Sequence, residues 1–280
     1  MMESQAIVVT GASSGIGADT AITLARLGYT VFAGVRGDAD AVRTEAAHPN
    51  LRAVRLDVTD VASISAAART VEASGLTLRG LVNNAGIAVA GPLELLPVDE
   101  LRRQFEVNVF GAVAVTQAFL PALRAARGRV VFVGSIAGRL AVPFVGPYGA
   151  SKFALRALAD ALRVELRPFG VSVALIEPGS VKTPIWQKGR DEKDRLLALL
   201  GSEAPALYGG AIDALFATTA QQERAGMPVA QVSAAIVDAL TARKPKANYL
   251  LGASARAGSV VALLPAGLRD RALRRSMRLP

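Results

Sequence analysis

The sequence predicts an α/β fold in which helices cover both faces of a doubly wound parallel sheet. Short runs of β-branched residues alternate with alanine- and leucine-rich stretches that are long enough to form crossover helices. The predicted strands are apolar at nearly every position, which is typical of strands buried on both faces. These observations predict one domain over residues 1–280, built on a sheet of about seven strands.

The individual elements follow from the order of these stretches along the chain. Strands are predicted at 6–10, 30–35, 52–56, 80–84, 129–134, 171–178 and 248–252. Helices are predicted at 15–27, 60–74, 99–126, 149–168 and 228–243, with a last helical segment at 259–278 that Pro265 interrupts.

Two segments stand apart from this alternation. Residues 183–227 contain prolines, the only tryptophan and the charged run "KGRDEKDR", and they follow the carboxyl end of a predicted strand. We interpret them as a substrate lid, with a variable surface excursion as the alternative. Residues 253–280 are expected to form a C-terminal helical extension.

Composition and charge exclude several classes of protein. Without cysteine the chain has no disulfide and no thiolate metal site, and its carboxylates and single histidine do not cluster as metal ligands. No signal peptide and no uninterrupted apolar run of ~20 residues is visible, so we expect a cytoplasmic protein without a transmembrane segment. The net charge of +9 favours anionic ligands or surfaces, but aromatic residues, at 5%, are too few for nucleic acid to be the expected partner.

The last residues, "GLRDRALRRSMRLP", have the pattern of a basic amphipathic helix. Two roles are open for 268–279. One is a weak contact with an anionic membrane surface. The other is packing on the chain's own subunit or on a partner, which we favour because so short a segment buries little area.

The turn between the first strand and the first helix carries three glycines. Gly11, Gly15 and Gly17 have the spacing G-x-x-x-G-x-G, and Ser13 and Ser14 add hydroxyl donors. Glycines let the backbone approach a pyrophosphate, whose charge is stabilised by the free N–H groups and the dipole at a helix N-terminus. Such turns also serve helix packing, but this one follows the first strand of a parallel sheet, which favours a dinucleotide site.

The end of the second predicted strand indicates which dinucleotide is bound. A carboxylate there hydrogen-bonds the 2′-hydroxyl of the adenosine ribose, whereas an arginine accommodates a 2′-phosphate. Arg36, in "FAGVRGD", therefore favours NADP, with NAD as the alternative cofactor and an ordinary surface arginine as the alternative interpretation.

These features occur together with further motifs in a fixed order. They are "TGASSGIG" (10–17), "LDVTD" (56–60), "NNAG" (83–86), Asn108, Ser135, "YGASK" (148–152) and "PGSVKTP" (178–184). In them the chain resembles the short-chain dehydrogenases/reductases over nearly its whole length, and more weakly the branch that contains 17β-hydroxysteroid and retinol dehydrogenases. The resemblance implies cofactor contacts from Gly11, Ser13, Ser14, Gly15, Ile16, Gly17, Arg36, Asp57, Val58, Asn84, Ala85, Gly86, Tyr148, Lys152, Pro178, Gly179, Val181 and Thr183.

Tyr148 and Lys152 are four positions apart on a predicted helix, so both side chains point into the same cleft. Two charges ~4 Å apart at an effective dielectric of ~20 interact by about 4 kcal/mol, so we expect Lys152 to lower the pKa of the Tyr148 phenol. Tyr148 is then the general acid/base and Ser135 hydrogen-bonds the substrate oxygen. The resemblance implies that Lys152 also holds the nicotinamide ribose, and that Asn108 binds a water in a proton relay where its helix is locally kinked.

The expected activity is hydride transfer between nicotinamide and a hydrophobic ketone or a primary or secondary alcohol, with NADP(H) preferred. The candidate substrate residues Ile136, Phe144, Ile185 and Trp186 are all apolar. Two alternatives remain: a dinucleotide-binding regulatory protein without turnover, and NAD-linked alcohol oxidation. The resemblance also implies a homodimer or homotetramer built on the helices at 99–126 and 149–168.

Overall fold

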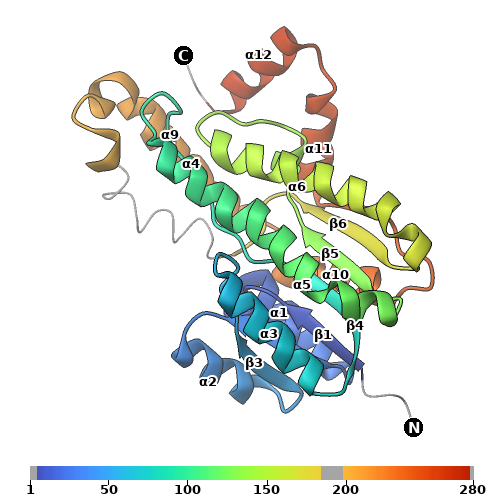
Figure 1. Ribbon diagram of the computed structural model, residues 1–280. Coiled ribbons are helices and arrows are strands. Elements are labelled where there is room, and N and C mark those ends of the chain that lie inside the picture. The colour runs from blue at the N-terminus through green and yellow to red at the C-terminus, as the bar shows by residue number, and fades with distance from the viewer. Residues whose placement is uncertain (1–4, 184–197, 278–280) are drawn as a thin grey trace.

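A parallel sheet of seven strands forms the centre of the molecule (Figure 1). The computed structural model describes residues 5–183 and 198–277. Every neighbouring pair of strands is parallel, and the order across the sheet is β3-β2-β1-β4-β5-β6-β7. All seven predicted strands are present, which confirms the doubly wound architecture. The strands are β1 (Gln5–Val9), β2 (Thr30–Val35), β3 (Leu51–Arg55), β4 (Thr77–Asn83), β5 (Arg129–Val133), β6 (Ser172–Pro178) and β7 (Asn248–Leu251).

Helices cover both faces of this sheet, and alternate strand residues point into the two layers. Ala6 and Val8 of β1 belong to one apolar cluster, which α3 (Val61–Ala73), α5 (Gly111–Ala125) and α6 (Gly146–Glu165) complete. Ile7 and Val9 point the other way, into a cluster with α1 (Gly15–Arg26) and α10 (Val229–Thr241). Figure 1 shows α3, α5 and α6 in front of the sheet. This two-sided burial is the reason why central strands such as β1 and β5 are apolar along most of their length.

The helix predicted at 99–126 is one continuous run with an irregular centre. It consists of α4 (Val98–Phe105), the π-helical turn η1 (Glu106–Phe110) and α5. By length and composition this run is apolar enough to cross a membrane, because an 18-residue stretch of it has a mean hydropathy of 1.3. Its apolar side chains Val115, Phe119 and Leu123 are instead buried against the sheet. The buried core helix of an α/β fold has the same composition.

Two of the longer helices within 5–183 and 198–277 were not predicted, and each omission has a physical reason. In α2 (Asp38–Ala47) only Thr44 is buried, so the segment has no apolar stripe to reveal it. In α9 (Ala204–Ala225), Gly209 and Gly210 disfavour a helix, but Ile212 and Leu215 are buried by tertiary packing. α9 lies within the predicted lid, and residues 184–197 of that lid are outside the described part of the chain.

The C-terminal extension consists of α11 (Ala253–Ala262) and α12 (Ala266–Ser276). It begins at the predicted residue 253, although its first helix starts before the helical segment predicted at 259–278, and Pro265 separates the two helices as the sequence predicts. Figure 1 shows both helices at one end of the molecule, beyond the carboxyl ends of the strands. This placement puts them beside the cleft described below.

Candidate active site

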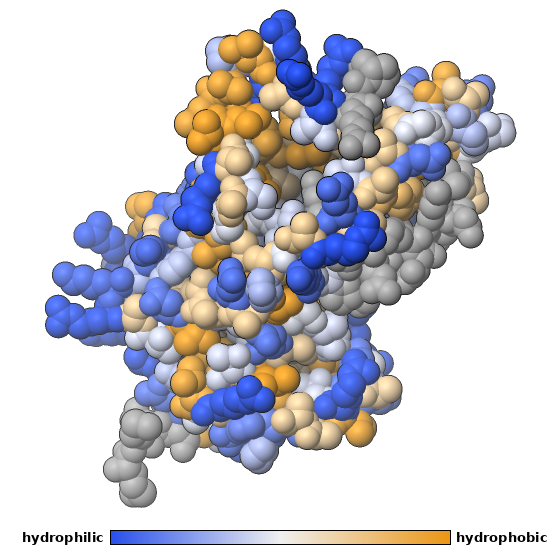
Figure 2. Space-filling view, turned by 180° about the vertical axis from the view of Figure 1, so that it is seen from behind, coloured by the Kyte–Doolittle hydropathy of each residue, from blue (hydrophilic) through white to orange (hydrophobic). Residues whose placement is uncertain are grey.

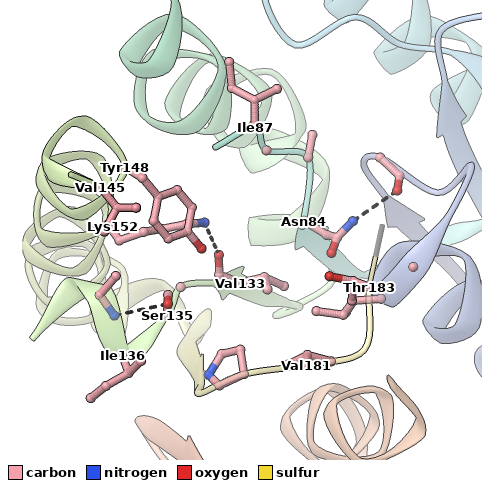
Figure 3. A pocket seen from close by; sticks show the side chains of 18 of the residues that line it. Asn84, Ile87, Val133, Ser135, Ile136, Val145, Tyr148, Lys152, Val181 and Thr183 are labelled. Carbon is pink, nitrogen blue, oxygen red and sulfur yellow. Dashed lines mark hydrogen bonds between the residues drawn. The ribbon is translucent and has the colours of Figure 1, made fainter. Parts of the chain in front are cut away.

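A cleft of about 570 Å³ lies at the carboxyl ends of the strands. It begins at the turn after β1, passes the ends of β4 and β5, and reaches α9, α11 and α12. In the strand order, β1 is the point from which the chain winds outward in both directions, and open α/β sheets bind their ligands at such switch points. Figure 3 shows side chains from several elements converging on this cleft.

The glycine turn forms one end of the cleft. Gly11 and Gly15 have φ angles of +63° and +57°, a conformation that favours glycine. The Asn84 side chain fastens this turn to β4, because its Nδ2 donates to the carbonyl oxygens of Thr10 at 2.9 Å and Gly11 at 3.1 Å. Gly17 does not line the cleft, and a Cβ there would lie 2.4 Å from the Asn84 Nδ2. Its role is therefore close packing of α1 on the turn.

The rim beside β2 and β3 carries charge. Arg36 and Asp57 both line the cleft. Burial acts to raise the pKa of Asp57, but hydrogen bonds from Thr59 and the positive charge of Arg36 bring it below its usual value. Arg43, on the unpredicted α2, places Nη2 3.3 Å from the carbonyl oxygen of Ser13. The sequence did not single out Arg43, because its position depends on that helix.

Tyr148 and Lys152 project from the first turns of α6 into the same cleft (Figure 3). The Lys152 Nζ lies 5.6 Å from the centroid of the Tyr148 ring and donates to the carbonyl oxygen of Val133 at 2.9 Å. Ser135 follows β5, and its Oγ accepts a hydrogen bond from the Ala137 N–H at 3.1 Å. The ring and the ammonium are buried and Ser135 is half-buried, and all three side chains line the same cleft.

Burial changes the acid–base properties of this pair in a direction that the sequence argument missed. Burial raises the pKa of the Tyr148 phenol, and a hydrogen bond with Ser135 only partly opposes that effect. Burial also lowers the pKa of Lys152 to about 8. The expected depression of the phenol pKa is therefore not found, because loss of hydration disfavours the charged phenolate. At neutral pH the phenol keeps its proton.

Asn108 lies behind the cleft in the π-helical turn η1 and does not line it. Its Oδ1 accepts from the Ile87 N–H at 2.9 Å, and its Nδ2 donates to the Ile87 carbonyl at 3.0 Å and to Ser151 Oγ at 3.1 Å. Gln104, four residues earlier, accepts from the Val89 N–H at 2.6 Å. Together Gln104 and Asn108 hold the backbone after β4 in place. Sequence reasoning missed Gln104, which is a buried polar side chain in a helix.

A buried carboxylate connects the segments that carry the reactive groups. Glu177 of β6 is fully buried and accepts hydrogen bonds from Arg139 Nε at 2.8 Å and from Arg156 Nη1 at 3.2 Å. Arg139 follows the Ser135 loop, Arg156 lies one turn after Lys152 in α6, and Glu177 precedes the Pro178–Gly179 backbone of the cleft. The hydrogen bond to Glu177 raises the pKa of Arg139. No local sequence pattern indicates this cluster, because its members are far apart in the chain.

The far end of the cleft is mostly apolar, with the hydroxyls of Thr218, Thr219 and Ser276 among its lining, and is formed partly by the C-terminal helices. Besides Ile136, it is lined by Leu140, Val142, Val145, Leu215, Leu273 and Met277. Phe144 does not line the cleft. It packs behind it, edge-on to Tyr208 with ring centroids 6.2 Å apart. Ile185 and Trp186 lie outside the described residues.

The other predicted site residues share the one cleft. It is lined by Gly11, Ser13, Ser14, Gly15, Ile16, Arg36, Asp57, Val58, Asn84, Ala85, Gly86, Ser135, Ile136, Tyr148, Lys152, Pro178, Gly179, Val181 and Thr183. No group of three metal-ligating side chains occurs within residues 5–183 and 198–277. The arrangement therefore offers an anion-binding turn at one end, a proton donor in the middle and an apolar chamber at the other.

Comparison with known proteins shows to which family a chain with this arrangement belongs. The family model of the short chain dehydrogenases matches residues 5–194. The chain is 39% identical to an NADPH-dependent 3-dehydrocapnine reductase of Ornithobacterium rhinotracheale, over 87% of each protein. It is 38% identical to human 11-beta-hydroxysteroid dehydrogenase type 2, over 96% of this chain and 70% of that protein. It is 37% identical to human retinol dehydrogenase 5, over 95% of this chain and 87% of the relative.

Solved structures agree with the sequence relatives. A short chain dehydrogenase from Burkholderia cenocepacia in complex with NADP has a TM-score of 0.73 at 25% identity, and covers 99% of this chain and 98% of its own. One from Burkholderia phymatum in complex with NAD has a TM-score of 0.77 at 26% identity, over 99% of this chain and 96% of its own. The chain therefore belongs to the short-chain dehydrogenase family, in the branch of the steroid and retinol dehydrogenases.

Proposed function

We propose that the protein reduces hydrophobic ketones with NADPH, and in reverse oxidises the matching alcohols. The proposal rests on one observation. The hydroxyls of Ser135 and Tyr148 and the ammonium of Lys152 share a buried space in the middle of a cleft whose two ends differ in chemistry. A proton donor between an anion-binding turn and an apolar chamber is the arrangement that hydride exchange with a carbonyl needs.

The residues at the glycine turn fit a dinucleotide. α1 begins at Gly15, and the side chain of Ser14, its N-cap, makes no capping hydrogen bond. N–H groups in the first turn of a helix are free to bind an anion, and the helix dipole adds to the attraction. The turn, together with Asp57, Val58 and Asn84, would hold the pyrophosphate and adenosine, and Lys152 and Thr183 would hold the nicotinamide half.

Arg36 supports a preference for NADP over NAD. Its guanidinium lies on the rim where the adenosine ribose is expected, and Arg43 reaches the Ser13 backbone from α2. The Arg36 guanidinium suits a 2′-phosphate, whereas Arg43 is paired with Asp40 at 2.5 Å and the nearby Asp38 with Arg55 at 3.2 Å. The relative from Ornithobacterium is named as NADPH-dependent, and the two structural neighbours hold NADP and NAD respectively.

The chain's own residues would handle the substrate oxygen and its proton. The bound reduced nicotinamide supplies the hydride that the carbonyl carbon accepts. The Ser135 hydroxyl donates a hydrogen bond that orients the carbonyl oxygen, and the Tyr148 hydroxyl, protonated at neutral pH because of its burial, transfers its proton to that oxygen. The Lys152 ammonium then stabilises the phenolate. We also propose that Tyr148 regains its proton through the water relay beside Asn108 that the family resemblance implies.

The substrate would be neutral and hydrophobic. The only charged side chains that line the cleft within the described residues are Arg36, Asp57 and Lys152. All three belong to the cofactor and proton-transfer ends, so the side chains of 5–183 and 198–277 that line the apolar chamber offer no charged partner for a substrate. Burying an unpaired charge there would cost several kcal/mol of binding free energy, so ionised substrates are disfavoured.

Replacement of Tyr148 by phenylalanine tests the reaction. We expect Tyr148→Phe to lower the rate of ketone reduction by about 10²–10⁴, the usual contribution of a general acid, while NADPH affinity stays near that of the wild type. Tyr29→Phe removes a phenol outside the cleft and serves as the control. A Tyr148→Phe enzyme that reduced ketones within tenfold of the wild-type rate would show that another group supplies the proton.

Assembly and location complete the proposal. The side chains of Phe110 and Phe153 are exposed on η1 and α6, so we propose that a homodimer or homotetramer forms through this surface. A cytoplasmic location also stays a proposal. Sedimentation of the wild type and of Phe110→Ser, which should dissociate, would test the interface.

A further inference from the structure

Gln104 of α4 is a fully buried polar side chain that the proposed reaction does not use. Its Nε2 donates to the carbonyl oxygen of Ile87 at 2.8 Å, and its Oε1 accepts from the Val89 N–H at 2.6 Å. Asn108, four residues later in the same helical run, binds the N–H and the carbonyl oxygen of Ile87. Two side-chain amides therefore hold one short stretch of backbone.

These two amides take the place of a neighbouring strand. Residues 84–92 follow β4 as irregular backbone, without a strand partner of their own. Four residues of a helix rise by about 6 Å, and two residues of extended chain span about 6.6 Å. The helical spacing of Gln104 and Asn108 thus matches the spacing of Ile87 and Val89, so both backbone positions can be bound at once.

The backbone that Gln104 binds lies between the cleft and α9. Ile87 lines the cleft (Figure 3). Further along the same segment, the Glu94 carboxylate accepts a hydrogen bond from the Tyr208 hydroxyl of α9. Val89 is buried in an apolar cluster that includes Leu200, Ala204 and Ile212. The position of α9 therefore depends on where this backbone is held.

α9 in turn forms part of the wall of the apolar chamber. Leu215, Thr218 and Thr219 line it, and Leu215 belongs to one apolar cluster with Val145 and Met277. In Figure 2 the surface is hollowed near its upper end, between the side that carries α12 and the side that carries α9, and apolar side chains line the hollow. A displacement of α9 would change the far end of the chamber and leave the reactive groups on β5 and α6 where they are.

We propose that Gln104 is a positioning residue that sets how long a ketone the enzyme accepts. It fixes the backbone at Ile87 and Val89, this backbone seats α9, and α9 bounds the chamber. The inference rests on the proposed function, since it concerns the substrate of that reaction. Within residues 5–183 and 198–277, Gln104 is the side chain that binds the Val89 N–H. A buried N–H that loses its partner is costly, so the segment would shift without Gln104.

Gln104→Met tests this role, because methionine keeps the length of the side chain and removes both hydrogen bonds. We expect the KM for a long ketone, 2-decanone, to rise about tenfold, whereas the KM for 2-butanone and the kcat for both ketones stay within about twofold. The affinity for NADPH should also be unchanged, because Ser135 and Lys152 keep their own backbone hydrogen bonds. Gln117→Met, at an exposed position of α5, is the matched control.

Gln104→Glu gives a form of the side chain whose hydrogen bonding depends on pH. A protonated carboxyl can donate to Ile87 and accept from Val89, whereas a carboxylate can only accept. Burial raises the pKa of an introduced carboxyl, and Glu100, one turn earlier, adds a negative charge that its pair with Arg103 partly offsets. Relative to the wild type at the same pH, we expect the KM for 2-decanone to be nearly normal at about pH 6 and about tenfold higher at about pH 9.

Hydrogen exchange with NADP⁺ bound tests the positioning without turnover. In Gln104→Met, the amides of residues 87–96 and 204–216 should exchange at least about fivefold faster than in the wild type, because less stabilisation holds them closed. The amides of β5 and α6 should keep their wild-type rates, as should every segment of Gln117→Met. Mass spectrometry of peptic fragments measures these rates.

The outcomes separate the positioning from the reaction. An equal loss with 2-decanone and 2-butanone, or unchanged exchange over residues 87–96 and 204–216, overturns the inference even if ketone reduction is otherwise normal. A Gln104→Glu enzyme whose KM for 2-decanone is raised as much at pH 6 as at pH 9 also overturns it. Faster exchange in Gln104→Met, with no ketone reduced by the wild type, leaves the positioning standing and counts against the proposed reaction alone.

Discussion

Removal of the buried charge of Glu177 should destabilise the fold and slow the reaction together. Glu177→Gln keeps the size of the side chain but leaves the guanidinium groups of Arg139 and Arg156 without their shared carboxylate. Loss of one partner from a buried ion pair costs about 3–5 kcal/mol. The side chains of the two arginines are 24% and 29% exposed, so water compensates in part and we expect about 2–3 kcal/mol.

Urea unfolding at pH 7 measures this loss directly. The midpoint should fall while the slope of the free energy against urea stays unchanged, and the melting temperature should drop by about 5–10 °C. Asp99→Asn, which breaks the exposed pair with Arg102, is the matched control and should cost less than about 1 kcal/mol. The turnover number should fall as well, because Glu177 holds together the segments that carry Ser135 and Tyr148.

A second variant separates a lost charge from a poorly folded protein. Arg139→Met in the Glu177→Gln background removes the cation that has lost its carboxylate, whereas Arg156 keeps Asp160 at 3.8 Å, and should recover about 1 kcal/mol of stability. A Glu177→Gln protein within 0.5 kcal/mol of the wild type, by the limit for surface substitutions, would refute the reasoning. It would mean that the arginines reach solvent when the carboxylate is neutral.

Two further predictions concern the cofactor and the pH dependence. Arg36→Asp should shift the ratio of NADPH to NADH affinity toward NADH by at least tenfold, because a charge-assisted contact with the 2′-phosphate is lost. Titration of the variant with both cofactors measures this ratio. An unchanged ratio would contradict the assignment of Arg36 to the 2′-phosphate. Because burial lowers the pKa of Lys152 to about 8 and raises that of Tyr148, ketone reduction should be flat near neutrality and fall as the pH rises through about 8, where the ammonium is lost. A rate that climbed steadily up to pH 10 would show that the charge of Lys152 is not required.

The sheet could be predicted because its central strands are apolar along most of their length. β1, β4 and β5 are buried on both faces, so burial leaves a continuous apolar signal in the sequence. α2 and α9 lack such a signal. The first buries almost nothing, and the second is stabilised by contacts with segments that are remote in the chain.

In the candidate site, too, some features could be predicted from the sequence and others could not. The positions of Ser135 and Lys152 follow from local rules, namely the end of a parallel strand and the spacing along a helix. The raised pKa of Tyr148 does not, because it depends on how completely the surrounding segments remove water from the ring. The same is true of Glu177 and Met277, which enter the account only when distant parts of the chain are brought together.

The position of α12 has a practical consequence for protein engineering. Leu273 and Met277 shape the chamber from a helix that lies outside the layered core, so side chains there can be exchanged without disturbing the sheet. Libraries that vary this helix should yield altered substrate preference at little cost in folding. For the same reason an affinity tag fused behind it risks changing the measured selectivity, and a tag at the other terminus is the safer choice.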